Sequence, residues 1–252
     1  MTPRLSVVII CWNSLANLQG LLASLPAALA GIGHEIILVD NGSSDGTDRY
    51  IAATHPDIVY RRLDRNRGVA YARNRGIELA SGRYIWLLDD DTVVNADAVG
   101  ALINYMEAHP VCGICACALR APDGALQRSY KLFPGLVPKL RGLLGMDGAD
   151  PYAPEMSAGL PFEPEYVIGA CQLVRREVFD AVGLLDEHIF YGPEDADFCL
   201  RARKSGWRVV YLPAVSIVHK WKRITSRRPL SAIGRAHIRA LFYFYRKHRR
   251  LL

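Results

Sequence analysis

RYIWLLDDDTVV, residues 83–94, places an apolar run directly before three adjacent carboxylates, those of Asp89, Asp90 and Asp91. The continuous apolar run is typical of a buried strand. Three neighbouring negative charges repel one another at low effective dielectric unless something positive lies among them. Oxygen-rich clusters suit Mg²⁺ or Mn²⁺, which often bridge to substrate phosphates. The stretch predicts a strand that ends in a metal and diphosphate site, and an acidic solvated loop is the alternative.

The sequence before this stretch alternates strand and helix patterns. The predicted strands are 5–12, 34–40, 57–63 and 83–89. The predicted helices, 14–29, 44–55 and 68–80, lie between them in the sequence. Ser14 is a candidate N-cap of the first helix. Continuous apolar strands that alternate with helices predict an α/β fold, with a parallel sheet covered by helices on both faces.

Polar residues gather where these predicted strands end. Asn13 follows the first strand and DNGSSDGT, residues 40–47, follows the second. Ligands of such sheets bind beyond the carboxyl ends of the strands. Asp40 and its loop suit the base or the ribose hydroxyls of a nucleoside. A second group lies near a helix start that can face phosphate, namely Asn66, Gly68 and Arg73.

The second half of the chain is less regular. Residues 133–166 hold six of the fourteen prolines and predict an irregular segment rather than a linker between domains. The apolar pattern resumes at 166–174, and a helix is predicted to follow Pro193 over 194–207. Residues 208–219 predict a strand, a kink at Pro213 and a second strand. Within the helix, Asp197 and Arg201 have the spacing of an i,i+4 ion pair.

Charge is unevenly distributed along the 252 residues, half of which are hydrophobic. The net charge is +6, yet residues 1–218 carry 20 basic and 25 acidic side chains. Residues 219–252 carry eleven Lys or Arg and no acidic residue. An acidic body repels phosphate, so we expect no nucleic-acid partner. The size suits one main domain.

Leader and anchor patterns are not visible in this sequence. The chain begins MTPRLSVVII, without a basic leader and apolar core, and no apolar run reaches the roughly 18 residues that span a bilayer. We therefore expect a cytoplasmic protein. Cys112, Cys115 and Cys117 lie close together, but VCGICACAL is apolar and no second cysteine pair accompanies it. Buried reduced thiols are favoured over a zinc site.

Five motifs occur in order along nearly the whole chain: SVVIICWN, VDNGSSDGT, NRGVAYARNRG, LLDDDTVV and GACQLVRREVFDAVGLLDEHIFYGPEDADFCLRARKSGWRVVYLPAVSIVH. In these motifs the chain resembles the metal-dependent, inverting GT-A glycosyltransferases of family 2, particularly bacterial rhamnosyltransferase-like members. The resemblance implies the GT-A fold, which is a Rossmann-like, mostly parallel sheet with helices on both faces. Two stretches depart from the pattern: KWKRITSRR after His219 is more basic, and Cys11-Trp12 replaces the usual pair before Asn13.

The resemblance also implies roles for particular residues. Asp89 and Asp91 form the ends of the DxD motif, Asp91 and His219 hold Mg²⁺ or Mn²⁺, and Asp195 in PEDAD is the catalytic base. The predicted donor-binding residues are Asn13, Asp40, Asn66, Gly68, Arg73, Asp89 and Asp90, with Asp40 at the nucleotide base. The predicted acceptor-side residues are Gly169, Ala170 and Glu194. Glu194 is the next candidate for the base.

The implied reaction moves a sugar from a nucleoside-diphosphate sugar to a hydroxyl of a glycan or lipid-linked acceptor, in cell-surface polysaccharide synthesis. dTDP-rhamnose is the first donor candidate and a UDP-sugar the second. The implied domains are a catalytic domain over 1–222, with a nucleotide-binding half of about 1–120 and an acceptor-binding half of about 121–222, and a basic extension over 223–252. The oligomeric state is not indicated by the sequence.

Two other functions remain open from the residues. DDDTVV imitates the nucleophile loop of haloacid-dehalogenase-like phosphatases, but that loop normally follows the first strand, whereas three strand-helix units precede it here. A nucleotide-sugar-binding module without turnover is the second alternative. The presence of Asp91, Asp195 and His219 together argues against it.

The C-terminal residues predict a basic amphipathic helix from Ser231 onward. Its apolar residues recur at helical spacing, and basic residues occupy much of the remaining surface. The apolar set is Ile233, Ile238, Leu241, Phe242 and Tyr245, and the basic set is Arg235, Arg239, Arg246 and Arg249. The helix either packs on the catalytic domain or attaches the protein peripherally to an anionic membrane surface at its cytoplasmic face.

Overall fold

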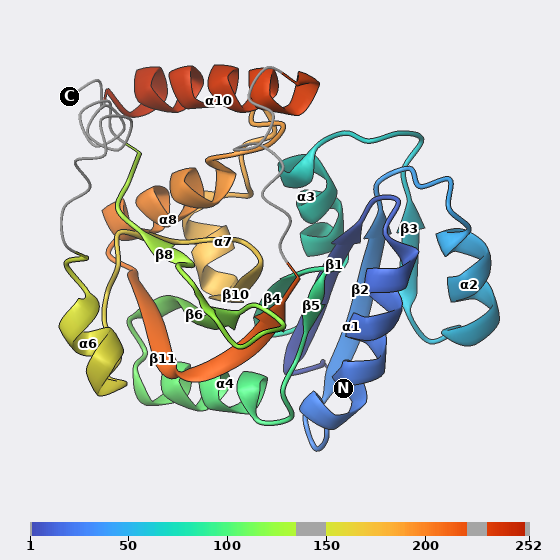
Figure 1. The fold of residues 1–252 in the computed structure, drawn as a ribbon, viewed down its shortest axis with the longest axis horizontal. Helices are drawn as coiled ribbons and strands as arrows, with labels where there is room; N and C mark the ends of the chain where they lie inside the picture. The colour runs from blue at the N-terminus through green and yellow to red at the C-terminus, as the bar shows by residue number, and fades with distance from the viewer. Residues whose placement is uncertain (1, 135–149, 221–230, 250–252) are drawn as a thin grey trace.

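A nine-stranded sheet forms the centre of the molecule, which a computed structural model describes over residues 2–134, 150–220 and 231–249 (Figure 1). The strand order is β3-β2-β1-β4-β10-β6-β11-β5, with β7 paired to β6, and β8 and β9 form a separate pair. The strands are β1 (Leu5–Cys11), β2 (His34–Asp40), β3 (Val59–Arg62), β4 (Tyr84–Asp89), β5 (Thr92–Val93), β6 (Cys112–Arg120), β7 (Leu126–Gln127), β8 (Tyr130–Lys131), β9 (Tyr166–Val167), β10 (Cys171–Arg175) and β11 (Arg208–His219).

The first four long strands confirm the predicted parallel arrangement. β1 pairs in parallel with both β2 and β4, and β2 pairs in parallel with β3. The register sets Cys11 opposite Asp40 and Ile10 opposite Asp89, so these strands end together at one edge. β10 runs against its neighbours β4 and β6, while β6 and β11 run with β1. The sheet is therefore mostly parallel, and the later half of the chain completes the sheet that the first half begins.

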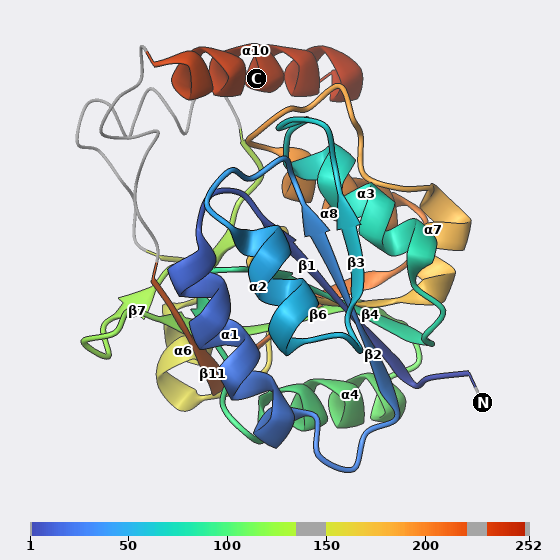
Figure 2. The same cartoon turned by 90° about the vertical axis from the view of Figure 1, so that its right-hand side faces the viewer.

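Helices cover both faces of the sheet (Figure 2). The helices are α1 (Leu15–Ala28), α2 (Thr47–Thr54), α3 (Val69–Leu79), α4 (Ala98–Ala108), α6 (Ala153–Ala158), α7 (Arg176–Val182), α8 (Glu194–Lys204) and α10 (Ala232–His248). Alternate residues of β1 face opposite sides, so Val7 packs with α1 and α4 and Val8 packs with α3 and α8. Burial of both faces explains why these strands are continuously apolar.

β11 contains the predicted kink. Its pairing with β6 shifts register between Leu212 and Ser216, around Pro213, because proline has no N–H to donate to the ladder. The strand then continues to His219 at the edge where β1, β2 and β4 end. The six cysteines are buried free thiols, as the sequence predicted.

Helix α10 packs on the body of the protein through a different stripe from the predicted one. Leu241 and Tyr245 are buried as predicted, but Phe244 is fully buried, while Ile238 and Phe242 are 43% and 67% exposed. Both stripes are apolar, so helical spacing alone did not distinguish them.

Ion pairs fix the orientation of α10. Lys247 Nζ lies 2.6 Å from Asp186 and 2.7 Å from Asp197, and His248 Nε2 lies 2.7 Å from Asp197. Asp197 also pairs with Arg201 at 2.8 Å, as predicted. The packing alternative for the helix is thus what the structure shows.

Three expectations fall partly or wholly on residues that the structure does not describe. These are the irregular segment at 133–166, of which 135–149 lie outside the described residues, the domain boundary at 222/223, and most of the basic stretch after His219. Within the described ranges, no helix combines the length and apolar character needed to cross a membrane.

Candidate active site

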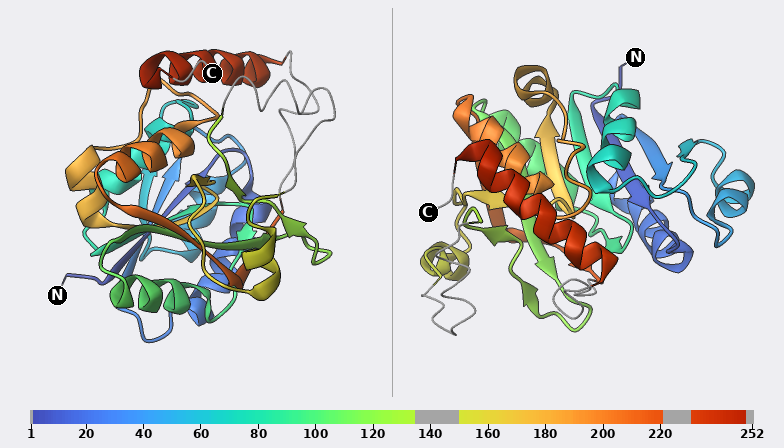
Figure 3. Two further views of the ribbon diagram at one scale, coloured as in Figure 1. Left: turned by 90° about the vertical axis from the view of Figure 1, so that its left-hand side faces the viewer. Right: turned by 90° about the horizontal axis from the view of Figure 1, so that it is seen from above.

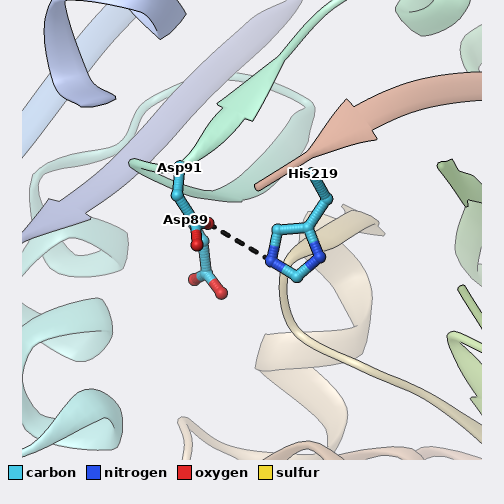
Figure 4. A group of neighbouring side chains, drawn as sticks. All are labelled: Asp89, Asp91 and His219. Carbon is cyan, nitrogen blue, oxygen red and sulfur yellow. Dashed lines mark ion pairs between the residues drawn. The ribbon is translucent and has the colours of Figure 1, made fainter. Parts of the chain in front are cut away.

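Two carboxylates and an imidazole meet at the carboxyl-end edge of the sheet (Figure 4). Asp89 ends β4, Asp91 lies two residues later, and His219 ends β11 opposite Thr92. Ligand atoms of Asp89, Asp91 and His219 all lie within 4.8 Å of one another. The structure thus brings Asp89 into the same group as the two residues predicted to hold the metal.

Gln127 fixes the orientation and the tautomer of His219. The Gln127 amide donates to the His219 carbonyl over 2.8 Å, so its oxygen faces His219 Nδ1, also at 2.8 Å. The amide oxygen there accepts a hydrogen bond from Nδ1–H and leaves Nε2 directed at Asp91. Nε2 lies 3.2 Å from Asp91 Oδ1.

The arrangement of these atoms fits a divalent cation. Asp91 Oδ1 is buried, and within the described residues it has no hydrogen-bond donor in good geometry. Burial lowers the pKa of His219, but the adjacent Asp91 carboxylate outweighs burial and raises it. A proton on Nε2 therefore stabilises the pair, and a cation bound between the two atoms would do the same. Two carboxylates and a neutral imidazole are ligands that Mn²⁺ accepts and that Mg²⁺ accepts in part.

Asp90 faces away from this group, toward Ser14. The Ser14 hydroxyl donates to Asp90 Oδ2, and burial raises the pKa of Asp90 to about 7. Ser14 occupies the N-cap position of α1, as predicted, but its side chain makes no capping hydrogen bond to the helix and contacts Asp90 instead. Asp45 Oδ2 instead accepts from the Leu15 N–H, over 2.9 Å.

The predicted nucleoside loop is a network of polar groups beside the buried Asp40, some of them buried and some exposed. Asp40 accepts a hydrogen bond from the Ser43 N–H at 2.7 Å and another from the Tyr60 hydroxyl at 2.7 Å. Asn13, which has a φ of 50°, accepts from the Ser44 N–H at 2.8 Å. The loops after β1 and β2 are therefore joined next to Asp40.

Asn66 and Gly68 shape the start of α3. Asn66 Oδ1 accepts from the Gly68 N–H at 2.9 Å and from the Asn41 amide at 3.1 Å. Gly68 has a φ of +92°, and a Cβ there would lie 2.6 Å from the Phe190 carbonyl oxygen. Only glycine permits this close approach between the start of α3 and the loop that leads to Asp195.

Arg73 connects three parts of the site. Its Nη2 donates to Asp89 over 2.6 Å and to the Gly169 carbonyl over 2.9 Å, and its Nη1 lies 3.6 Å from Glu194. Arg73 is only 3% exposed. The side chain that was expected to face phosphate is thus directed at two carboxylates in this structure.

Glu194 and Asp195 begin α8 and are both buried. The Gly169 N–H lies 3.3 Å from Asp195 Oδ2, and the Gly192 N–H donates to Glu194 at 2.9 Å. Burial and the adjacent Asp195 raise the pKa of Glu194, and burial also raises the pKa of Asp195 despite the nearby cations Lys131 and Arg73. A buried carboxylate with a raised pKa suits proton abstraction near neutral pH.

Gly169 and Ala170 link Asp195 to the acidic cluster. They lie just before β10, and the Ala170 carbonyl accepts from the Asp89 N–H at 3.3 Å. A Cβ on Gly169 would lie 2.0 Å from Arg73 Nη1, so this position tolerates no side chain without movement of Arg73. A set of residues from both predicted sides of the site therefore forms one connected group, namely Arg73, Asp89, Gly169, Ala170, Glu194 and Asp195.

Three residues of the site were missed from the sequence: Gln127, Asp45 and Lys131. Gln127 and Lys131 lie on two-residue strands, which leave no periodic pattern. Asp45 lies in the quoted DNGSSDGT loop, but a contact to a helix 30 residues away has no local signature.

Comparisons with known proteins find glycosyltransferases among the relatives of this chain. The sequence model of the family described as "Glycosyl transferase family 2" matches residues 6–183. An N-acetylglucosaminyl-diphospho-decaprenol L-rhamnosyltransferase of Mycobacterium tuberculosis is 30% identical over 97% of this chain and 84% of its own length. The low-salt glycan biosynthesis hexosyltransferase Agl10 of Haloferax volcanii is 25% identical over 87% of this chain and 68% of its own.

Solved structures share the fold at low identity. A Pyrobaculum calidifontis mannosyltransferase in complex with GDP-Man and Mn²⁺ aligns with a TM-score of 0.64 and 18% identity, over 91% of this chain and 61% of its own. GalNAc-T7 with UDP, GalNAc and Mn²⁺ aligns with a TM-score of 0.63 and 17% identity, over 99% of this chain and 55% of its own. At these identities the likeness extends to the fold alone.

Proposed function

The chain belongs to glycosyl transferase family 2 and is a glycosyltransferase of glycan biosynthesis, and from this premise we propose that it is a metal-dependent inverting enzyme. It would transfer one sugar, rhamnose in the first instance, from a nucleoside-diphosphate donor to a hydroxyl group of the acceptor. A single displacement at the anomeric carbon inverts its configuration.

The observation that carries this proposal is the connection between the acidic cluster and the buried pair on α8. Asp89 belongs to the group that can hold a cation, and Arg73 joins Asp89 to Glu194 beside Asp195. A leaving diphosphate and an attacking hydroxyl need opposite electrostatic environments on the two sides of one sugar. The chain has both within one network.

On the donor side, Asp89, Asp91 and His219 would hold Mg²⁺ or Mn²⁺ against the diphosphate. The bound cation would neutralise charge on the departing phosphate. Asp40, Asn13 and the Asn66–Gly68 segment would bind the nucleoside, with Asp40 at the base. Arg73 would keep Asp89 oriented, since their 2.6 Å contact is buried on the arginine side.

On the acceptor side, Asp195 would remove the proton of the attacking hydroxyl. Its support is its burial, its raised pKa and its hydrogen bond from Gly169, which restricts its rotation. Glu194 is engaged by Arg73 and the Gly192 N–H and would help to position the acceptor loop. Gly169 and Ala170 would form the floor of the acceptor site.

The proposed substrates follow, by analogy, the L-rhamnosyltransferase of Mycobacterium tuberculosis. Its name specifies transfer to a sugar carried on a lipid diphosphate. We propose dTDP-rhamnose as donor, with a UDP-sugar second, and a glycan or lipid-linked acceptor. Residues 1–120 would bind the nucleotide and residues 121–222 the acceptor, while 223–252 would form an extension. A lipid-linked acceptor would place the enzyme peripherally at the cytoplasmic face of a membrane.

A donor-turnover assay with and without Mn²⁺ tests the function. A glycosyltransferase releases nucleoside diphosphate from dTDP-rhamnose or a UDP-sugar, and release depends on the metal. Release of inorganic phosphate would instead indicate a phosphatase, and tight nucleotide binding without turnover, with acceptor present, would indicate a binding module. A thermal-shift screen of nucleotides first selects the donor, because saturation at 100 times the dissociation constant adds about 2.7 kcal/mol of stability.

A further inference from the structure

Helix α10 has an outward face that combines exposed arginines with exposed apolar side chains. The residues of this outer face are Arg235, Ile238, Arg239, Phe242, Arg246 and Arg249. At 100° per residue they fall within a sector of about 100° on the helix. Phe242, 67% exposed, has the highest exposed fraction among the large apolar side chains of the described residues.

We propose that this outer face docks on an anionic lipid bilayer, an inference that rests on the proposed transfer to a membrane-borne acceptor and names the surface that serves it. Phe242 and Ile238 would enter the boundary between headgroups and acyl chains. The flanking arginines would contact lipid phosphates. A helix with this distribution lies in the plane of the bilayer surface.

The described contacts that hold α10 on the body come mainly from its inner face. The inner face of α10 buries Leu241, Phe244 and Tyr245, and Lys247 and His248 pair with acidic residues of the body. Arg239, Arg246 and Arg249 are exposed, and no ion pair joins them to another described residue. The inner face therefore fixes the helix with the outer face directed at solvent.

The charge distribution favours lipid over other partners. Residues 219–252 contain no acidic side chain, so this surface attracts anions, whereas residues 1–218 have more acidic than basic side chains. Nucleic acid would be repelled by that acidic body and offers no apolar layer for Phe242 and Ile238. An anionic bilayer supplies both phosphate and hydrocarbon within reach of one helix face.

The position of α10 suits delivery of a membrane-borne acceptor. The helix lies alongside the α8 and α3 side of the molecule in two perpendicular views (Figures 1 and 3). A Cβ built on Gly192 would lie 2.2 Å from His237 Nδ1, so α10 touches the loop three residues before Asp195. A bilayer on the outer face would be separated from that loop by roughly the 10–12 Å diameter of a helix.

Vesicle co-sedimentation of the full chain tests the proposal. We expect binding to equimolar phosphatidylglycerol and phosphatidylcholine vesicles at low salt, weaker binding at high salt, and little binding to phosphatidylcholine alone. Arg239→Glu with Arg246→Glu should lower the partition coefficient at least about tenfold. Ile238→Ser with Phe242→Ser should weaken binding in both salt conditions. Leu160→Ser and Arg61→Glu are matched controls, because both residues are exposed and lie outside α10.

Several outcomes would overturn the inference. One is a wild-type chain that ignores the anionic vesicles, and another is equal binding by the α10 variants and the wild type. A concentration-dependent dimer that Phe242→Ser abolishes in size-exclusion chromatography would identify a second copy as the occupant. Donor turnover is measured in parallel without vesicles and should be the same in every variant. Lost vesicle binding with intact turnover rejects only the docking surface, whereas absent turnover with intact vesicle binding rejects only the proposed function.

Discussion

His219 Nε2 lies 3.2 Å from Asp91 Oδ1, at the point where the last residue of β11 meets the acidic segment after β4. The two residues are 128 positions apart in sequence, and the β11–β5 pairing places them side by side. Without a bound cation, this close contact is favourable only when Nε2 carries a proton that it can donate to Asp91. The stability of the contact therefore depends on whether a proton or a metal ion lies between the two atoms.

Asp91→Ala should abolish the metal-dependent part of nucleotide-diphosphate binding while the protein stays folded. The substitution removes a metal ligand, and it also removes one of three mutually repelling carboxylates. Calorimetric titration of UDP and dTDP with and without Mn²⁺ measures the effect, and circular dichroism monitors folding. Asp57→Ala, at an exposed aspartate, is the control. Unchanged affinity in Mn²⁺ would contradict the metal assignment.

Gln127→Leu should weaken Mn²⁺ binding roughly 10- to 100-fold, the usual cost of losing an outer partner of a histidine ligand. The variant loses both the acceptor for Nδ1–H and the donor to the His219 carbonyl. Gln127→Glu keeps an acceptor for Nδ1–H, so its Mn²⁺ affinity should lie between that of the wild type and that of Gln127→Leu. Titration of Mn²⁺ in the presence of nucleotide gives the affinities. Gln19→Leu, at an exposed site on α1, should behave as wild type.

Asp195→Asn should lower turnover by about 10²- to 10⁴-fold, as expected for loss of a positioned general base, with donor affinity retained. In the wild type, burial raises the pKa of this carboxyl, so its reactive, ionised fraction grows as pH rises. The acidic limb of the pH–rate profile should therefore lie at higher pH than for an ordinary aspartate, and the variant should lose it. Near-normal turnover in Asp195→Asn would move the base to Glu194, which Glu194→Gln then tests.

Gly169→Ala should reduce turnover strongly, because its Cβ would lie 2.0 Å from Arg73 Nη1 and displace the guanidinium from Asp89. Gly100→Ala is a matched control, since a Cβ there meets no atom within 4 Å and the residue lies inside α4. That control should be slightly stabilised, by roughly 0.5–1 kcal/mol. Equal turnover in the two variants would show that the close contact at Gly169 is unimportant.

Lys247→Met should destabilise the protein by about 1–3 kcal/mol near neutral pH, because Asp197 is buried and loses one of its cationic partners. Burial raises the pKa of Asp197 and of Asp186, but their hydrogen bonds and ion pairs outweigh it and lower both values. Lowered carboxyl pKa values stabilise the fold above the unfolded pKa near 4, and this stability is lost as pH falls further.

The wild-type free energy of unfolding should therefore fall more steeply than that of Lys247→Met as pH decreases below about 4. Denaturant unfolding at several pH values measures both slopes. Arg246→Met, one residue earlier on the exposed side of α10, should retain the wild-type slope. Parallel slopes for wild type and Lys247→Met would show that the ion pairs do not stabilise α10.

The sequence predicted most of the sheet because long buried strands leave a clear pattern. β1, β2 and β4 contain continuous apolar runs, and their alternation with helices, together with the strand predicted at 57–63, defined the α/β class. The two-residue strands β5 and β7 left no pattern, yet they position Asp91 beside His219 and Gln127 behind it. Residues of the site could be recognised from the sequence, whereas the contacts that orient them depend on tertiary pairing.

Helix α10 is a second case in which the sequence predicted an element but not its contacts. The stretch LFYFY, residues 241–245, has apolar residues on two faces of the helix, so periodicity alone allowed Phe242 to face inward. Asp186 and Asp197 lie on other parts of the chain and pair with Lys247 and His248, which selects the stripe that contains Phe244. Local pattern therefore predicted the helix, and distant charges determined its rotation.

Arg73 joins the acidic cluster after β4 to the buried carboxylates of α8, so we expect the proposed donor and acceptor sides to be energetically coupled. One guanidinium contacts Asp89, the Gly169 carbonyl and Glu194, which belong to three different segments. In a double-mutant cycle, substitutions at Asp89 and Glu194 should show coupling rather than additive costs. Substitutions around Gly169 that are meant to change the choice of acceptor would therefore also alter donor binding. Such variants would have to be designed together with substitutions at Arg73.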